Sequence, residues 1–272
     1  MTIIIWLWVF SLPILMLLSF LSIIPAIIIL FTSGCISFAI QCYNYDNIIT
    51  TSIFRTKANN INWLSWFKSL HVHNKPANNT NYLIISQPHG VLCCGILTGV
   101  HFRPNSKTVF AVAPVLFYIP ILGWILRELG CIPAEKRLIK KALTMTSVIL
   151  AIDGVPGIVA IENNTLYIDK RFGAFKIALE TNTSIIPTWT TNEYKTYSLL
   201  SLPFVEFRKE LSNRLGIAII FPYIFGWKGT WLPKPVDLIV TLGTPIEPGS
   251  MSVTVLKREY LNALRRLYSQ ST

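Results

Sequence analysis

An uncharged stretch near the N-terminus constrains this chain more than any other feature. No charged side chain occurs from Ile3 to Ile40, whereas one membrane-spanning helix needs only about 20 apolar residues. The stretch is too long for a single straight span or a signal-peptide core, and Pro13 and Pro25 provide points for a turn. We therefore predict a transmembrane helical hairpin over residues 1–42. A single long tilted span and a helical pair buried in a soluble core are the alternatives.

The charged residues indicate how this anchor is oriented and what the chain binds. The first basic side chains, Arg55, Lys57 and Lys68, all follow the apolar stretch, which places the rest of the chain on the cytosolic side. The chain has 24 Lys and Arg against 13 Asp and Glu, a formal net charge of +11. Such an excess attracts anionic lipids, nucleic acid or acidic ligands. No nucleic-acid-binding module is recognisable, so we expect membrane lipids and no nucleic acid as partners.

The cysteines indicate a reducing environment and no metal site. There are five of them, an odd number, and none has the C-x-x-C spacing of metal ligands. The adjacent pair Cys93 and Cys94 lies in an apolar run, which is typical of small core residues. We therefore expect neither a disulfide framework nor a bound metal, in agreement with a cytosolic domain.

The rest of the chain divides into a connecting segment, residues 43–80, and a domain, residues 81–272. In the connecting segment, the stretch Ile61–Lys68 is predicted to lie in the membrane interface with Trp63, Trp66 and Phe67 at headgroup depth. The domain alternates apolar runs with helical spacing, which predicts an α/β layered fold with a largely parallel or mixed central sheet. The predicted strands are 82–86, 109–113, 157–161, 185–189 and 236–242, and the predicted helices begin at 91 or cover 135–150, 173–180 and 255–268. Two apolar stretches, 112–126 and 215–227, are broken by Pro and Gly; they suit a domain that dips into one leaflet, a wall for an acyl chain, or ordinary core packing.

The most informative short motif is Ser86-Gln87-Pro88-His89-Gly90. It follows a predicted strand and precedes a predicted helix, and ligands of α/β sheets gather at the carboxyl ends of strands. A helix N-terminus disfavours a protonated imidazole, so His89 is predicted to be a neutral base near pH 7. Backbone N–H groups of the same turn are candidates to stabilise an oxyanion. The alternative is a turn histidine that only caps the helix.

The motif resembles a known family. Pro88-His89-Gly90 after an apolar strand is similar to the His-Pro-His-Gly motif of the type-2 diacylglycerol acyltransferases and their monoacylglycerol and wax-ester relatives, within the glycerolipid acyltransferase superfamily. Later stretches agree with the family in order and spacing, and together they cover nearly the whole chain: Phe117–Leu122, Gly130–Pro133, Arg171–Leu179, Ile185–Trp189 with Asn192-Glu193, and Trp231–Pro233 with Val240–Ile246. The resemblance implies a glycerolipid-acyltransferase-like layered domain behind the hairpin.

The chain departs from the family pattern at three positions. Gln87 replaces the first histidine of the motif, Ile158 stands where the family has the second glycine of a Val-Pro-Gly-Gly block, and Ile161 stands where it has a glutamate, with Glu162 one place later. Cys94 stands where glycerol-phosphate acyltransferases carry an aspartate, so the usual orienting carboxylate is absent, as it is in the diacylglycerol branch. Asp153, Glu162 and Glu193 are the candidates to assist His89, and we favour Glu193 because it lies in a matching motif.

The resemblance implies transfer of an acyl group from acyl-CoA to the hydroxyl of diacylglycerol or a similar neutral lipid, with no cofactor besides the co-substrate acyl-CoA. It implies His89 and Glu193 as catalytic residues and the following substrate-binding residues: Gln87, Pro88, Gly90, Arg171 and Lys176. For Arg171 and Lys176, binding of the CoA phosphates and a charge at the membrane interface are the two alternatives. The basic run 136–141 touches headgroups or CoA, or is a solvated helix face. Location in the endoplasmic reticulum membrane is expected. A lysophospholipid, monoacylglycerol or wax-alcohol acyltransferase, and a non-catalytic lipid-binding relative, are the alternatives.

Overall fold

The computed structural model describes residues 25, 32, 59–60, 62, 65–74, 80–103, 106–119, 122–154, 171–199, 210–211, 224–230 and 232–271. The predicted hairpin, most of the connecting segment, the predicted strand 157–161 and Glu162 lie outside these residues. Within the part of the chain described, no helix has the length and apolar character that a membrane crossing requires.

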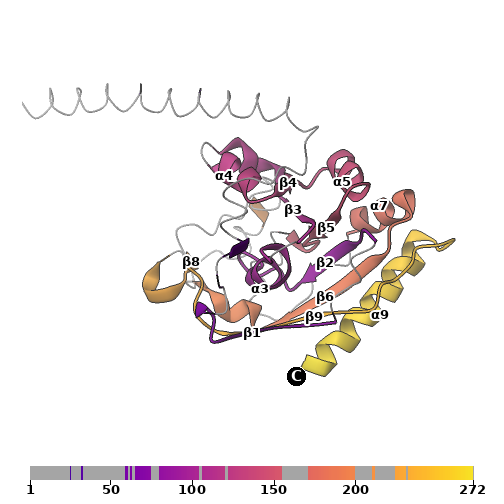
Figure 1. Cartoon of the computed structure of the whole chain (residues 1–272). Coiled ribbons are helices and arrows are strands. Elements are labelled where there is room, and N and C mark those ends of the chain that lie inside the picture. Colours follow the sequence, from indigo (N-terminus) through magenta and orange to yellow (C-terminus); the bar gives the residue numbers. More distant parts are fainter. Residues whose placement is uncertain are drawn as a thin grey trace, which may run out of the picture.

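A seven-stranded mixed sheet forms the centre of the domain (Figure 1). Its strands are β1 (Ser69–His73), β2 (Leu83–Gln87), β3 (Thr108–Val112), β4 (Cys131–Pro133), β5 (Ser147–Leu150), β6 (Ile185–Thr191) and β9 (Asp237–Leu242), in the order β1-β9-β6-β2-β5-β3-β4. Strands β6, β2, β5, β3 and β4 run parallel, and β9 is antiparallel to β6. A short pair, β7 (Ser198–Leu199) and β8 (Ile224–Phe225), forms a second sheet. The predicted α/β fold with a mixed sheet is confirmed.

Helices cover both faces of the sheet. The α-helices are α3 (Cys94–Ile96), α4 (Leu122–Glu128), α5 (Lys136–Leu143), α7 (Gly173–Thr181) and α9 (Val253–Ser271). Alpha-helix α3 continues as a π-helical turn, η2 (Leu97–His101), and 3₁₀ turns form η3 (Pro114–Tyr118), η5 (Glu193–Thr196) and η6 (Trp227–Gly229). Figure 1 shows α5, α7 and α9 on one side of the sheet and α3 on the other.

The alternation of side chains along the strands explains this two-sided packing. Leu83 and Ile85 of β2 join the core cluster that includes α5, α7 and α9, whereas Ile84 joins the cluster that includes α3. Successive strand residues point to opposite faces, and a sheet that is buried on both faces needs continuous apolar strands. On α9, the buried residues Leu256, Tyr260, Leu264 and Leu267 recur at helical spacing and cover one face.

The structure corrects the predicted helix over residues 135–150. Helix α5 ends at Leu143, and Ser147–Leu150 is the buried strand β5, which pairs with β2 and β3. A short apolar run such as Ser147–Leu150 is compatible with either a helix or a strand. In the folded chain its β-branched residues favour a strand, and this strand pairs with neighbours on both sides. The other predicted elements within the described residues are confirmed to within a few residues. Strand β1 was missed, so the sheet begins inside the predicted connecting segment.

The predicted placement of Phe67 at headgroup depth is wrong, that of half-buried Trp66 stays a prediction, and Trp63 lies outside the described residues. Phe67 is buried in the core cluster on the α3 side. The Trp66 indole Nε1 donates a hydrogen bond to the Pro233 carbonyl oxygen at 3.1 Å, and its ring packs edge-on against Trp227. Burial against the sheet therefore uses Phe67, which the sequence pattern assigned to the membrane interface.

Candidate active site

The motif residue His89 lies directly after the central strand β2. The strands on either side of β2 are β5 and β6, both parallel to it. Carboxyl ends of neighbouring parallel strands meet at one edge of a sheet. This edge brings together the segments that follow three strands, and each segment carries one of the candidate residues: His89 after β2, Asp153 after β5 and Glu193 after β6.

The His89 turn (residues 87–93) has an unusual backbone path. The Gln87–Pro88 peptide bond is cis, and Gly90 and Cys93 have φ values of +59° and +51°. A Cβ atom on Gly90 would lie 2.8 Å from Cγ of Glu193, so this position requires glycine for both conformation and space. The Cys93 N–H then donates to the His89 carbonyl oxygen at 3.1 Å, and α3 begins at Cys94.

The geometry of the His89 ring defines which nitrogen is basic. Its Nδ1 lies 2.9 Å from the Gly90 carbonyl oxygen. Because a carbonyl oxygen only accepts hydrogen bonds, Nδ1 carries the proton in this contact, and Nε2 of the neutral ring keeps its lone pair. Cys93 Sγ lies 3.7 Å from the same Nδ1. Burial is the main cause that raises the pKa of the Cys93 thiol well above its usual value, and the charge of Glu193 is the second cause. Cys93 is therefore a packing residue rather than a thiolate nucleophile.

Asp153 contacts the His89 turn from the β5 side. Its Oδ2 accepts a hydrogen bond from the backbone N–H of His89 at 3.2 Å, and only 3% of the residue is exposed. Burial raises the pKa of the Asp153 carboxyl above its ordinary value, and the nearby His89 opposes this shift. The second oxygen, Oδ1, has no hydrogen-bond partner among the described residues. The carboxylate therefore holds the backbone of His89 and keeps one oxygen available.

Glu193 contacts the segment just beyond the turn from the β6 side. Its fully buried carboxylate accepts hydrogen bonds from the backbone N–H groups of Cys94, at 2.5 Å, and Gly95, at 2.8 Å. Burial raises the pKa of Glu193 to about 7, against the effect of these two hydrogen bonds. Asn192, just before it, has a φ of +64°, a conformation that asparagine tolerates, and it stands where the resembled family has glycine.

These contacts change the expected role of two groups. Glu193 was predicted to assist His89, but its oxygens bind the amides of Cys94 and Gly95. The candidates for an oxyanion site were the backbone N–H groups of the turn around His89. The His89 amide is likewise bonded to Asp153. The amides of Gly90, Val91 and Leu92 are not among these bonded donors.

Buried polar atoms also lie on the α9 side of the sheet. The Gln87 side chain is fully buried, and neither its amide nitrogen nor its oxygen has a hydrogen-bond partner among the described residues. Within the same part of the chain, the hydroxyl of buried Tyr260 is also without a partner. Burial raises the pKa of the Tyr260 hydroxyl well above its usual value, and the charge of Asp153 adds to this shift. No sequence signal points to Tyr260 beyond its place on a basic, amphipathic helix.

The predicted substrate-binding residues fall into three groups. Gln87 and Gly90 are buried and Pro88 is half-buried. Arg171 is exposed, and its Nη2 lies 3.7 Å from the place of a Cβ atom on Gly154, next to Asp153. Lys176 lies on the exposed face of α7, and no contact within the described residues joins it to the His89 turn. The structure therefore brings Arg171, but not Lys176, beside the site.

Comparison with known proteins adds a family to this geometry. The family model described as Diacylglycerol acyltransferase matches residues 30–271. Diacylglycerol O-acyltransferase 2-like protein 6 of Mus musculus is 27% identical over 224 residues, which cover 70% of this chain and 66% of that protein. Diacylglycerol O-acyltransferase 2 of Xenopus tropicalis is 24% identical over 252 residues, 77% of this chain and 68% of that protein. The matched region thus spans just under two thirds of the Mus musculus protein.

A solved structure is also similar. The 1-acyl-sn-glycerophosphate acyltransferase PlsC of Thermotoga maritima superposes with a TM-score of 0.49 at 15% identity, over 78% of each chain. This similarity is too low to support a statement about activity. The family match has a firmer basis, because it covers 30–271 of 272 residues. The chain belongs to the diacylglycerol acyltransferase family.

Proposed function

We propose that the chain is a membrane-bound O-acyltransferase, which transfers a fatty acyl group from acyl-CoA to the hydroxyl of diacylglycerol or a similar neutral lipid alcohol. The observation that carries this proposal is the His89 ring, whose Nδ1 lies 2.9 Å from the Gly90 carbonyl oxygen. That contact leaves Nε2 as a base at the carboxyl end of β2. Family membership and the names of the relatives support an acyl transfer to a glycerolipid.

The reaction follows from the chemistry of a neutral imidazole. His89 Nε2 takes the proton of the acceptor hydroxyl while that oxygen attacks the thioester carbonyl carbon. Collapse of the tetrahedral intermediate forms the ester and breaks the carbon–sulfur bond. The departing CoA thiolate takes the proton back from the imidazolium, so His89 is neutral again. No acyl-enzyme is needed because the thioester is already activated.

The remaining residues serve this step in different ways. Asp153 stabilises the transient imidazolium and holds the His89 backbone, and Glu193 fixes the start of α3. Arg171 is suited to bind a CoA phosphate beside the site, and Lys176 is a second candidate farther along α7. Gln87, Pro88 and Gly90 set the path of the turn. Residues 1–42 anchor the domain in the endoplasmic reticulum membrane with the domain on the cytosolic side.

Acyl transfer by membranes that carry the full chain tests this function. Labelled acyl-CoA is supplied with diacylglycerol, monoacylglycerol, lysophospholipid or fatty alcohol, and the esters formed are separated. We expect wild type to acylate diacylglycerol and His89→Ala to lose about 10²–10⁴-fold of the rate. His71→Ala, an exposed histidine on β1, is the matched control and keeps the wild-type rate. Transfer to none of the alcohols would instead support the non-catalytic lipid-binding alternative.

A further inference from the structure

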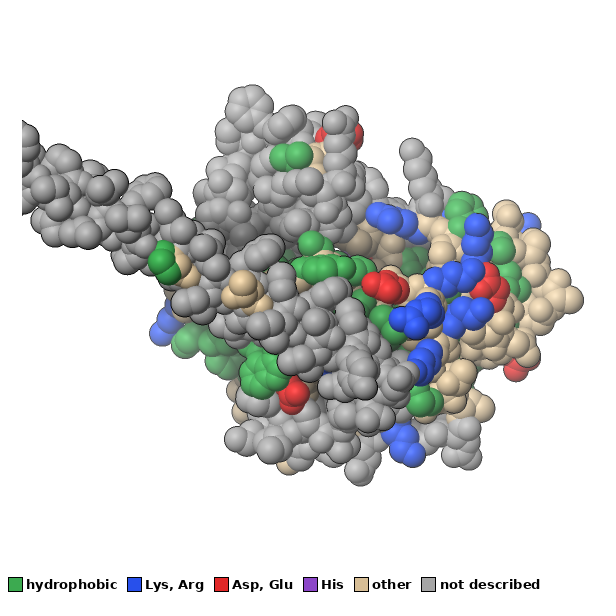
Figure 2. Space-filling model, turned by 90° about the horizontal axis from the view of Figure 1, so that it is seen from above, with side chains coloured by type: hydrophobic (Ala, Val, Ile, Leu, Met, Phe, Trp, Pro, Cys, Tyr) green, Lys and Arg blue, Asp and Glu red, His purple; other side chains and the backbone are tan. Residues whose placement is uncertain are grey.

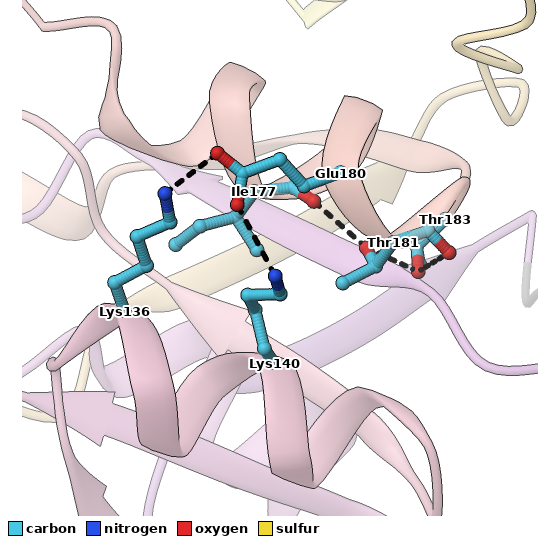
Figure 3. Close-up of polar contacts among 6 residues, drawn as sticks. All are labelled: Lys136, Lys140, Ile177, Glu180, Thr181 and Thr183. Atoms are coloured by element: carbon cyan, nitrogen blue, oxygen red, sulfur yellow. Dashed lines mark hydrogen bonds and ion pairs between the residues drawn. The ribbon is translucent and has the colours of Figure 1, made fainter.

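Two clusters of ionisable side chains on the described surface differ in whether their members bind one another. On α5 and α7, the Glu180 carboxylate binds Lys136 at 2.6 Å and Lys140 at 3.2 Å (Figure 3). Figure 2 shows Lys and Arg side chains gathered on one face of the domain. On β1, the imidazoles of His71 and His73 contact each other by stacking, and neither ring has a hydrogen-bond or ion-pair partner among the described residues. This second cluster is free to bind a ligand.

The two histidines of β1 point to the same side of the sheet. Successive strand residues alternate between the two faces, and Leu70 and Val72 pack into the core cluster on the α3 side. His71 and His73 therefore point to the side that carries α9, which packs on β6. Because β1 is the last strand at its end of the sheet, both histidines are exposed there. Their ring centroids lie 6.4 Å apart, with 24° between the ring planes.

Two parallel imidazoles on one strand suit a transition metal ion. Histidine is the commonest metal ligand in proteins, and imidazole suits Zn²⁺, Cu²⁺ and Ni²⁺. Bonds of about 2.0–2.1 Å join such an ion to each ring nitrogen, so the stacked rings need only small rotations about their side-chain bonds. Among the described residues, no group of three or more His, Cys, Asp or Glu could hold a metal ion. The pair therefore leaves the other coordination positions to water.

The neighbouring strand β9 adds a negative charge to the same face. Ser69 is opposite Asp237 in the parallel pairing of β1 with β9, and His71 is opposite Ile239. The Ser69 hydroxyl donates a hydrogen bond to Asp237 Oδ1 at 2.8 Å. Because Ser69 and His71 are two residues apart on one strand, the Asp237 carboxylate lies on the histidine face. A carboxylate diagonally across from His71 favours a bound cation.

We propose that His71 and His73 form a binding site for one divalent transition metal ion of the Cu²⁺, Ni²⁺ and Zn²⁺ class. Both imidazoles reach one ion only while the residues between them are extended, so the bound ion stabilises β1 at the edge of the sheet. Strands β9 and β6 lie between β1 and β2, so the site is separate from His89. The cysteine spacing, from which no metal is expected, does not bear on this pair. The site does not depend on the proposed acyl transfer.

Copper binding by the full chain, purified in detergent without a histidine tag, tests the site. The electron paramagnetic resonance spectrum of added Cu²⁺ reports the bound fraction and the nitrogen ligands. We expect one ion per chain with two imidazole nitrogens. Ni²⁺ should compete more weakly than Cu²⁺ itself, and Mg²⁺ should not compete, because it prefers oxygen ligands. His71→Ala and His73→Ala should each weaken binding about 10²-fold, because the second imidazole acts at a high effective concentration. His89→Ala should keep the wild-type affinity.

An exchange of two neighbouring residues, His73→Asn together with Asn74→His, is the matched control. It keeps the composition and the charge but moves the second imidazole off the face of His71. We expect this variant to bind Cu²⁺ as weakly as His73→Ala, and we expect Ni²⁺ to raise the unfolding temperature of wild type only. Equal Cu²⁺ affinity of wild type and the exchange variant would overturn the proposal, as would an affinity that His71→Ala does not change. Neither result bears on the proposed acyl transfer.

Discussion

Two buried carboxylates hold the His89 segment, one from each side of β2, and they do so differently. Glu193 uses both oxygens on the amides of Cys94 and Gly95, whereas Asp153 uses one oxygen on the His89 amide and keeps the other without a partner among the described residues. A buried carboxylate with both oxygens bonded is an anchor of the fold. A carboxylate beside the catalytic base, with one oxygen available, is suited to stabilise the positive charge that forms on that base during the reaction. The comparison separates a residue needed for stability from a residue needed for rate.

Removal of Glu193 is the largest expected effect on stability. Glu193→Ala leaves two buried N–H groups without acceptors, and each such group costs about 1–3 kcal/mol. Thermal unfolding of the purified chain in detergent should show a clear loss of stability. Glu180→Ala is the control, because its ion pairs with Lys136 and Lys140 are exposed and such pairs contribute little. Equal, small losses in both variants would mean that Glu193 does not anchor α3.

Gly90→Ala tests how closely the turn packs on this anchor. The substitution combines a left-handed φ of +59° with a Cβ atom 2.8 Å from Cγ of Glu193. We expect a loss of about 2–3 kcal/mol of stability together with a loss of activity. Gly229→Ala has the same kind of φ, +76°, but nothing within 4 Å, so it should cost only about 1 kcal/mol. If the two variants unfold at the same temperature, the contact between Gly90 and Glu193 is unimportant.

Asp153→Asn tests the second carboxylate, which is expected to affect the rate of transfer rather than the stability. Asparagine keeps an acceptor for the His89 amide but removes the charge that stabilises the imidazolium. We expect the rate of transfer to fall about tenfold, equivalent to about 1.4 kcal/mol, with the KM for acyl-CoA and the unfolding temperature nearly unchanged. A loss of stability like that of Glu193→Ala would remove the distinction between the two carboxylates.

The pH dependence of stability is expected to be a modest effect. Burial raises the pKa of Glu193 to about 7, so the folded chain binds a proton that the unfolded chain has already released above about pH 4.5. This contribution is present at low pH and is lost as the pH rises through 7. Relative to Glu193→Gln, wild type should lose about 1.4 kcal/mol of stability between about pH 6 and pH 8. A difference that stays constant over this range would contradict the raised pKa.

The sequence predicts the sheet better than the site. Strands β2, β3, β6 and β9 are apolar runs with clear boundaries, and helices α7 and α9 have long apolar faces, so local pattern and tertiary packing agree. Strand β5 was not predicted, because the apolar residues among its four positions continue the helical spacing of the apolar residues in α5. Phe67 was assigned to the membrane interface because burial against the sheet and burial in an interface require the same kind of side chain.

At the site, the turn around His89 was predicted, but its carboxylate partners were not. Glu193 was favoured over Asp153 on motif position alone, and motif position does not give distance. Only the parallel pairing of β2 with β5 and with β6 decides which backbone amide each carboxylate reaches. With residues 147–150 assigned to a helix, Asp153 did not stand at a strand end, so the signal that would have placed it beside His89 was lost.

The most direct test of the central claim is a double-mutant cycle between His89 and Asp153, with the rate of acyl transfer as the readout. If Asp153 acts through His89, Asp153→Asn lowers the rate about tenfold in the wild-type background and has no further effect in the His89→Ala background. Losses that multiply in the double variant would show that the two residues act independently. That result would contradict the account of a base positioned by this carboxylate.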